Sequence, residues 1–246
     1  MVKNRTINKL RDSEILAKRA AQVQGGAARA AVLGINDGLV STVCLILGVA
    51  AATGGNQHPV LVAGFAGLIA GAFSMAAGEW ISVQSQVELF QGILGDLKKL
   101  VKRDLTLLRE NLETKLIEIG MNPKAAQTAA HDMAKKSDHF EVLYATQVLG
   151  VNPDELGSPW TAALSSLALF TLGSLVALAP WFFMGGTTAA IISVAFTALV
   201  SIGVGAYIAR SSGKNLAYGA ARQFLIVLAA SAVTYGVGSL FGVALG

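Results

Sequence analysis

Two segments of the chain place acidic and sulfur-containing residues inside long apolar runs. The sequence AGAFSMAAGEW, positions 70–80, carries Met75 and Glu79 one helical turn apart, and a run at 28–52 carries Asp37. Carboxylate oxygens combined with a thioether sulfur suit a borderline divalent transition ion such as Fe²⁺, Mn²⁺, Co²⁺ or Zn²⁺ better than Mg²⁺ or Ca²⁺. Because carboxylates must lose their protons to bind a metal, such a site would also respond to pH.

Both groups of residues follow helical spacing. The first stripe consists of Asp37, Ser41 and Cys44, and the second of Met75, Glu79, Ser82 and Gln86. Residues at i, i+4 and i+7 share one face of a helix. Counted inward from opposite ends of their apolar runs, Asp37 and Met75 reach a similar depth. The spacing therefore predicts two polar stripes that meet inside a membrane.

The elements that carry these stripes are long enough to cross a bilayer. The chain has 246 residues, of which 53% are hydrophobic and 14% charged. A spanning helix needs about 20 apolar residues, and five stretches qualify: 28–52, 59–84, 159–183, 186–210 and 217–243. The sequence thus predicts an all-α membrane protein with five transmembrane helices.

The Asn36-Asp37-Gly38 sequence would favour a turn in a soluble protein. If the first span began only after Gly38, about 15 residues would remain, which is too few to cross the membrane. We therefore expect Asp37 to lie inside the span. A charged side chain at that depth normally faces the bundle interior or a cavity.

The distribution of Lys and Arg predicts the orientation. Residues 1–27 form a basic arm, whereas the connections at 53–58 and 184–187 contain neither Lys nor Arg. Basic loops remain in the cytosol, so we expect a cytosolic N-terminus and a non-cytosolic C-terminus. The basic residues lack interleaved aromatic side chains, which argues against nucleic-acid binding.

Residues 85–157 form the largest polar segment, between spans two and three. Leucines and isoleucines recur every three or four residues up to Gly120, which predicts helix. A second helix is expected after the Asn122 cap and a third up to Gly150. The predicted division is therefore an arm at 1–27, spans one and two at 28–84, a cytosolic three-helix domain at 85–157, and spans three to five at 158–246.

Each candidate residue also has a structural interpretation. Met75 could fill a gap between helices, Asp37 could be a hydrogen-bonded structural carboxylate, and Cys44 could be a small core residue. Glu79 could lie at the headgroup level beside Trp80. No His-Glu-x-x-His sequence occurs and the chain has only three histidines, so the sequence does not indicate an enzyme.

Three longer segments resemble the vacuolar iron transporter family, including its nodulin-like branch. They are RAAVLGINDGLVSTVCLILGVAAA, AGAFSMAAGEWISVQSQVE and RQFLIVLAASAVTYGVGSLFG. The resemblance implies a five-span homodimer that moves Fe²⁺ and often Mn²⁺ out of the cytosol in exchange for protons. It places the membrane metal ligands at Asp37, Met75 and Glu79. The host membrane would be a vacuole-type or bacterial inner membrane.

The segment 85–157 departs from the family pattern. Glu88 is retained, but Gln91, Leu94, Lys98 and Lys99 stand where further ligands are expected, and Tyr144, Ala145 and Val148 replace Met, Met and Glu. Weaker candidate ligands are Cys44 in span one and, within this segment, Glu110, Glu113, Met133 and Glu141. We therefore expect weak metal binding by this domain and no resident cofactor.

Two functions fit these observations: a metal/proton antiporter, and a membrane protein that holds metal as a sensor or store without transporting it. Gly-x-x-x-Gly sequences begin at Gly34, Gly67 and Gly238. Such sequences allow close helix contact and are a weak indication of a dimer.

Overall fold

The computed structural model describes residues 26–135, 137–151 and 157–245, and every element in these ranges is a helix. The described residues fall into two compact units. We call Gly26–Ile81 with Pro159–Gly246 the bundle unit, and Ser82–Ser158 the insert unit. Of the predicted basic arm, residues 1–25 lie outside the described residues.

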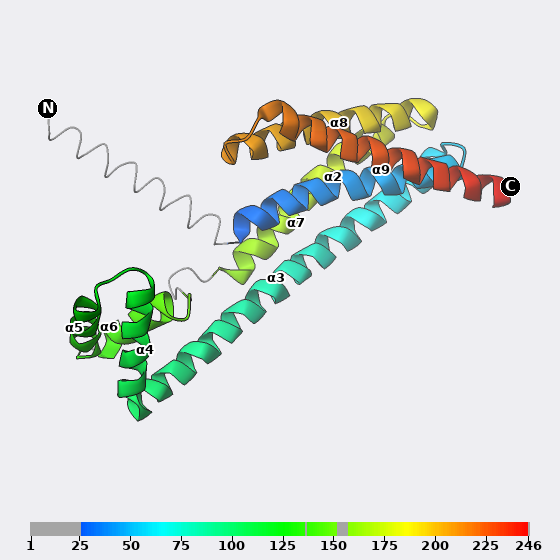
Figure 1. Ribbon diagram of the computed structural model, residues 1–246. Coiled ribbons are helices and arrows are strands. Elements are labelled where there is room, and N and C mark those ends of the chain that lie inside the picture. The colour runs from blue at the N-terminus through cyan, green and yellow to red at the C-terminus, as the bar shows by residue number, and fades with distance from the viewer. Residues whose placement is uncertain (1–25, 136, 152–156, 246) are drawn as a thin grey trace, which may run out of the picture. The chain divides into compact units, whose positions relative to one another are not determined.

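The bundle unit contains five helices long and apolar enough to cross a membrane (Figure 1). They are α2 (Ala27–Ala52), α3 (Gln57–Arg103), α7 (Pro159–Leu178) with the short helix η2 (Ala179–Phe182), α8 (Gly186–Ser211) and α9 (Leu216–Leu245). These bounds confirm the five predicted spans. Helix α3 is a single helix of 47 residues that continues beyond the apolar run at 59–84.

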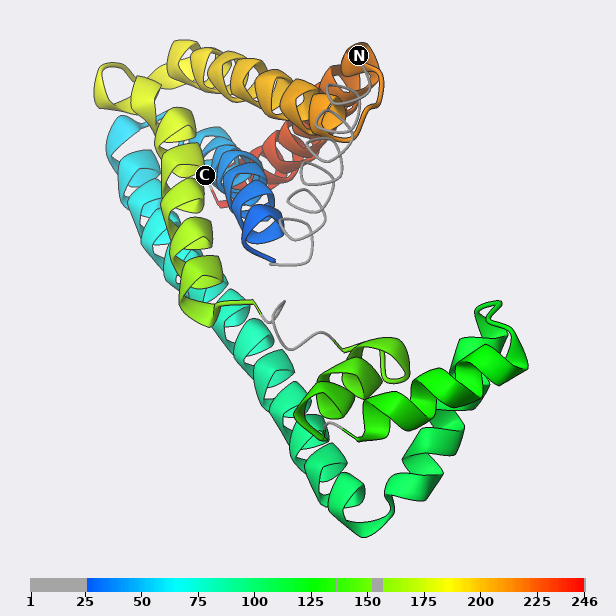
Figure 2. The ribbon, with the colours of Figure 1, turned by 90° about the vertical axis from the view of Figure 1, so that its left-hand side faces the viewer.

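Helix α2 is the central helix of the bundle unit and contacts α7, α8 and α9 (Figure 2). Its buried side chains, including Val43, Ile46 and Leu47, join the side chains of Leu178 and Trp181 in one apolar core. A hydrogen bond of 2.6 Å from the Gln57 side chain to the Trp181 carbonyl oxygen fastens the start of α3 to the end of the third span. Polar contacts of this kind stabilise helix association where lipid replaces water.

The Asn36-Asp37-Gly38 sequence lies within α2, which runs unbroken from Ala27 to Ala52, so the predicted helix is confirmed. Gly34 and Gly38 face α7. A Cβ at Gly34 would lie 2.7 Å from the Ser166 carbonyl oxygen, and one at Gly38 would collide with the Phe170 backbone. Glycine is therefore needed at both positions because the two backbones touch.

The Gly-x-x-x-Gly sequences that begin at Gly34, Gly67 and Gly238 all pack against other helices of the same chain. Gly34 and Gly38 lie against α7, Gly67 and Gly71 against side chains of α2 and α7, and Gly238 and Gly242 against the backbone of α2. Their contacts are thus accounted for by packing inside one protomer. They give no support to the interpretation of these sequences as dimer contacts.

The insert unit consists of the end of α3 from Ser82 with α4 (Leu105–Glu118), α5 (Pro123–Ala134) and α6 (Ser137–Gln147). Leu108, Leu112 and Leu116 of α4 pack against Ala126 and Phe140 in a separate apolar core. The Asn122 side chain accepts a hydrogen bond of 3.1 Å from the Lys124 backbone and caps α5 as predicted.

The prediction of uninterrupted helix up to Gly120 is wrong at one point. The chain turns between Arg103 and Leu105, and the Asp104 side chain accepts a hydrogen bond of 3.1 Å from the Leu107 backbone. Aspartate competes with helix interiors through such local bonds and caps the next helix instead. The regular leucine spacing continues across this turn, so hydrophobic periodicity alone does not indicate it.

Candidate functional site

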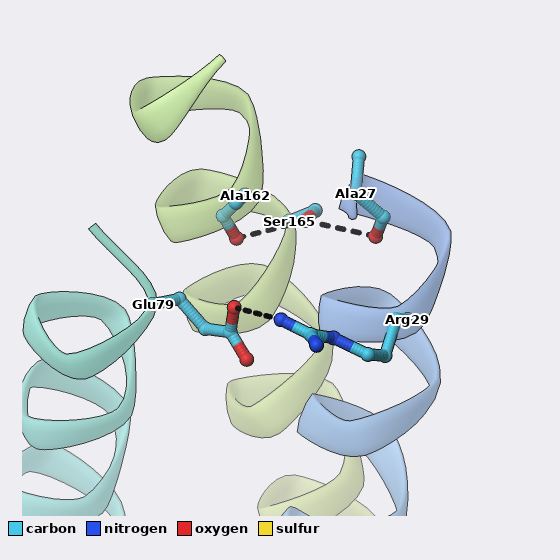
Figure 3. A network of polar contacts seen from close by, with 5 residues as sticks. All are labelled: Ala27, Arg29, Glu79, Ala162 and Ser165. Atoms are coloured by element: carbon cyan, nitrogen blue, oxygen red, sulfur yellow. Dashed lines mark hydrogen bonds and ion pairs between the residues drawn. The ribbon is translucent and has the colours of Figure 1, made fainter. Parts of the chain in front are cut away.

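Glu79 is buried at the end of the bundle unit where α2 begins. Its exposed fraction is 8%, and its carboxylate faces Arg29 in the first turn of α2 (Figure 3). The Arg29 Nη2 and Glu79 Oε2 atoms lie 3.8 Å apart, which is an ion pair without a hydrogen bond. The Glu79 carboxylate is therefore shielded from solvent and faces a positive charge.

The start of α7 supports this corner of the bundle. The Ser165 hydroxyl donates to the Ala162 carbonyl at 2.9 Å and reaches the Ala27 carbonyl at 3.5 Å, which links α7 to the first turn of α2 (Figure 3). Trp80, next to Glu79, packs edge-to-face on Trp160 with ring centroids 6.0 Å apart. Paired tryptophans at one end of a bundle are typical of the membrane–water interface.

Contacts between α2 and α3 at two levels indicate how the two helices are aligned. Gly64 lies against Ile46, Gly67 against Leu45, and Glu79 pairs with Arg29 near the other end. Interpolating along this antiparallel pair places Asp37 level with Phe73. Met75 then lies about 3 Å from Asp37 along the helix axis, at about 1.5 Å per residue. The shared depth of Asp37 and Met75 inside a membrane stays a prediction.

Asp37 lies on the exposed face of α2, together with Ser41 and Leu45. The Ser41 hydroxyl donates a hydrogen bond to the Asp37 backbone carbonyl, so it satisfies a main-chain group. The opposite arrangement holds for Gly34, Gly38 and Thr42, which face α7 and are buried. Within one protomer the carboxylate of Asp37 is thus directed away from the packed core.

Met75 and Cys44 are both half-buried. Cys44 packs against the apolar core of the bundle unit, which favours its interpretation as a small core residue. Within one protomer the structure does not assemble Asp37, Met75 and Glu79 into a closed ligand set, so their joint role stays a prediction. Among the described residues, no group of three or more His, Cys, Asp or Glu could hold a metal ion.

The candidate residues of the insert unit are scattered. Glu88 is exposed and accepts a hydrogen bond of 2.7 Å from Gln84, Glu110 is exposed, and Glu113 and Glu141 are half-buried. Met133 is 40% exposed. These residues form no acidic cluster in the described part of the insert unit.

Other acids of the insert unit pair with lysines three residues away. Lys99 bonds Asp96 at 2.9 Å, Lys115 bonds Glu118 at 2.9 Å and Lys135 bonds Asp132 at 2.8 Å. A hydrogen bond and the positive charge of Lys135 lower the pKa of Asp132 below its usual value. Exposed pairs of this spacing are typical of solvated helix surfaces.

Arg29 was not among the predicted site residues, because its contact with Glu79 joins two helices and leaves no pattern in the sequence. Sequence reasoning also missed a buried polar row on α8 formed by Ser193, Thr197 and Ser201, all fully buried. Gln223 and Ser231 of α9 are also buried, and their side-chain oxygens accept no hydrogen bond from protein groups. The spacing of four residues on α8 was the available signal.

Comparison with known proteins gives a consistent result over nearly the whole chain. Residues 28–239 match the VIT family. The chain is 34% identical over 215 residues to "Vacuolar iron transporter homolog 1" of Oryza sativa subsp. japonica, covering 87% of this chain and 73% of that protein.

Two further relatives align over a similar length. "Vacuolar iron transporter" of Acanthamoeba castellanii is 32% identical over 219 residues, covering 86% of this chain and 77% of the relative. "Vacuolar iron transporter homolog 2" of Arabidopsis thaliana is 32% identical over 218 residues, covering 87% and 84%. The matched ranges include both polar stripes and the insert unit.

Proposed function

The chain belongs to the VIT family and is a multi-pass membrane protein that transports metal ions, and we propose that it exports Fe²⁺, Mn²⁺ or both from the cytosol in exchange for protons. Co²⁺ and Zn²⁺ are further candidate cargoes because they have similar ligand preferences. Asp37, Met75 and Glu79 are the residues that would handle the ion.

The observation that carries this proposal is the exposure of Asp37 midway along a spanning helix. A carboxylate that faces lipid at this depth costs at least about 2.5–3.5 kcal/mol. A second copy of the chain, placed against the exposed face of α2, would remove Asp37 from lipid and set two such carboxylates opposite each other. We therefore propose a homodimer with the ion path between the two copies.

The chemistry of Asp37 and Met75 suits the proposed cargo. Asp37 supplies a hard oxygen and Met75 a soft sulfur within one helical turn of the same level. This mixture favours borderline transition ions over Mg²⁺ and Ca²⁺, which prefer oxygen ligands alone. Two copies of each residue in a dimer would give four protein ligands, and the remaining positions could be filled by water.

Glu79 is the proposed first ligand for an ion that arrives from the cytosol. It lies one helical turn from Met75, toward the end of the bundle where α2 begins. Its carboxylate is fixed by burial, and one of its oxygens accepts no hydrogen bond from protein groups. An arriving cation can therefore gain a ligand without breaking a hydrogen bond.

Proton exchange follows from the same carboxylates. A carboxylate must be ionised to bind a metal ion, and it regains a proton most readily when the ion leaves. Asp37 and Glu79 can therefore carry protons in the direction opposite to the metal. Such exchange couples metal export to a proton gradient with no further cofactor.

The proposed orientation puts the N-terminus in the cytosol and the C-terminus on the far side. Arg29, Arg210 and Lys214 lie at one end of the helices of the bundle unit, whereas the connections α2–α3 and η2–α8 contain neither Lys nor Arg. Lys and Arg accumulate on the cytosolic side of membrane proteins. The insert unit, which begins at Ser82 shortly after Glu79 in the sequence, would then be cytosolic.

A transport-inactive sensor or store is the competing proposal. It would require a substantial metal site outside the membrane path, and the insert unit is the part available for one. The acids of its described residues are dispersed, and several are paired with lysines. This arrangement favours transport over storage.

The decisive experiment is metal uptake by the purified chain reconstituted in liposomes with an imposed pH gradient. Fe²⁺, held reduced, and Mn²⁺ are tested separately, with Mg²⁺ as the ion to be rejected. We expect uptake of at least one transition ion, together with proton movement in the opposite direction. Metal binding without uptake would instead support a sensor or store. Uptake without proton movement would refute proton antiport but not metal transport.

A further inference from the structure

Arg29 makes an unusual contact for this chain. Among the described residues, its pair with Glu79 is the one ion pair between two different helices, because the other three join residues three positions apart. The pair links the first turn of α2 to α3 through Glu79, the carboxylate that we propose receives the arriving ion (Figure 3).

The two partners differ in their freedom to move. The Arg29 side chain is 63% exposed and the Glu79 side chain 10% exposed. Their charged atoms are 3.8 Å apart and form no hydrogen bond. The carboxylate is therefore fixed by its surroundings, whereas the guanidinium can turn into solvent without displacing packed side chains.

A buried carboxylate needs a positive partner, since an unpaired charge removed from water is costly. Arg29 is that partner while no metal ion is bound. A divalent cation at Glu79 would repel the guanidinium, so the two positive groups would compete for one carboxylate. Arginine is suited to this role because it stays charged at any physiological pH.

We propose that Arg29 is a built-in competitor that occupies Glu79 until a divalent cation displaces it and that returns when the cation moves on. This inference rests on the proposed function only in taking Glu79 as a cation ligand. Binding of the cation then also releases the contact between α2 and α3 at this end. Return of Arg29 hinders the ion from falling back toward the side from which it came.

The proposal predicts opposite effects on binding and on turnover. Without Arg29, the cation meets no competitor and binds Glu79 more tightly. The same loss removes the group that helps the cation leave Glu79 for the next site. A purely structural ion pair would weaken binding when broken, because the carboxylate would lose its position.

The test measures Fe²⁺ binding to the purified full-length protein by anaerobic equilibrium dialysis. The Fe²⁺ bound at Glu79 is defined as the binding lost in Glu79→Gln. We expect Arg29→Gln to lower the Kd of this component by roughly 5- to 10-fold, a size typical of coupled sites. Arg29→Lys, which keeps the charge, should remain within about twofold of wild type.

Two further variants make the result specific. In the Glu79→Gln background, Arg29→Gln should have no further effect, because the competitor and its target are then both absent. Arg210→Gln is the matched control. It removes an exposed arginine at the same end of the bundle that pairs with no described carboxylate, and it should leave Fe²⁺ binding unchanged.

Uptake by liposomes gives a second readout, in which Arg29→Gln should lower both KM and kcat. Unchanged or weaker Fe²⁺ binding in Arg29→Gln, or an effect that persists without Glu79, would overturn the proposal. The binding assay does not depend on transport. Failure of wild-type uptake would therefore count against the proposed function, while the coupling of Arg29 to Glu79 would be judged by dialysis alone.

Discussion

The Thr42 hydroxyl of α2 donates a hydrogen bond of 2.8 Å to the Ser174 hydroxyl of α7, one turn beyond Asp37. The Ser174 hydroxyl lies 3.3 Å from the Gly38 carbonyl oxygen and bonds to it. These bonds fix the rotation of α2 about its own axis. With Thr42 and Gly38 directed at α7, Asp37 must lie on the exposed face.

Gly38→Ala tests this packing independently of the Asp37 carboxylate. A Cβ at Gly38 would collide with the Phe170 backbone, which cannot move aside as a flexible side chain could. We expect a marked loss of thermal stability in detergent and a loss of transport, although every proposed ligand is retained.

Gly78→Ala is the matched control, because a Cβ there meets nothing within 4 Å. It should be neutral or slightly stabilising, by at most about 1 kcal/mol. Equal melting temperatures for the two variants would show that α2 and α7 can separate without cost.

Asp37→Asn removes the proposed membrane carboxylate and keeps its size. We expect uptake to fall to background while expression, thermal stability and the oligomeric state stay near those of wild type. Asp96→Asn is a matched control that removes a lysine-paired carboxylate from the insert unit, and it should transport normally. Loss of folded protein in Asp37→Asn would instead assign Asp37 a structural role, and full uptake would remove it from the mechanism.

The acids of the insert unit should contribute little to transport. Combined replacement of Glu88, Glu110, Glu113 and Glu141 by glutamine should leave initial uptake within about twofold of wild type, because these side chains are dispersed in the structure. A drop of tenfold or more would mean that the four residues act together in the assembled protein.

Asp132 gives a related expectation for pH. Its pKa is lowered by Lys135, so the pair's contribution to stability is complete above the ordinary aspartate pKa and is lost as pH falls through the lowered value. Asp132 therefore stays ionised across the neutral range. Asp132→Asn should leave the pH profile of transport between pH 5 and 8 unchanged, measured as initial uptake against wild type.

The five spans could be predicted from the sequence because about 20 consecutive apolar residues have few other stable arrangements. The continuity of α2 through Asn36-Asp37-Gly38 followed from length alone. Asp104 could not be identified as a helix boundary, because the leucine spacing is equally regular on both sides of it. The boundary is set by the hydrogen bond that its side chain accepts from the Leu107 backbone. Local hydrogen bonds decided that point, and hydrophobic periodicity does not register them.

For the candidate site, residue counts are enough to predict a depth and a helix face for Asp37 and Met75. Whether the two residues bind one ion together stays a prediction. The partner of Glu79 was not predictable, since Arg29 lies on another helix and is distant from Glu79 in the sequence. The glycine spacing was also ambiguous because packing within one chain and packing between two chains require the same small residues.

Met75→Leu tests the need for sulfur. Leucine has a similar volume, so the loss of stability should be under about 1.5 kcal/mol. Without the thioether, only oxygen ligands remain, and we expect the preference for Fe²⁺ over Mg²⁺ or Ca²⁺ to weaken in competition uptake assays. Met133→Leu is the matched control, because it replaces a methionine of α5 that is 40% exposed. This variant should keep the wild-type preference for Fe²⁺. An unchanged ion preference in Met75→Leu would assign Met75 to packing alone.

Glu79→Gln tests whether the buried carboxylate at the Arg29 end exchanges protons. In wild type, protons compete with the cation for Glu79, so uptake should slow as the pH on the loading side falls. Glutamine keeps the shape of the side chain but has no acidic proton to bind or release. We expect slower uptake and a flatter dependence of initial rate on the pH of the loading side. Glu118→Gln, which breaks only an exposed pair with Lys115, should keep the wild-type profile. A Glu79→Gln profile that is slower but parallel to wild type would make Glu79 a metal ligand without a role in proton exchange, and an unchanged rate and profile would reduce its pair with Arg29 to a structural contact.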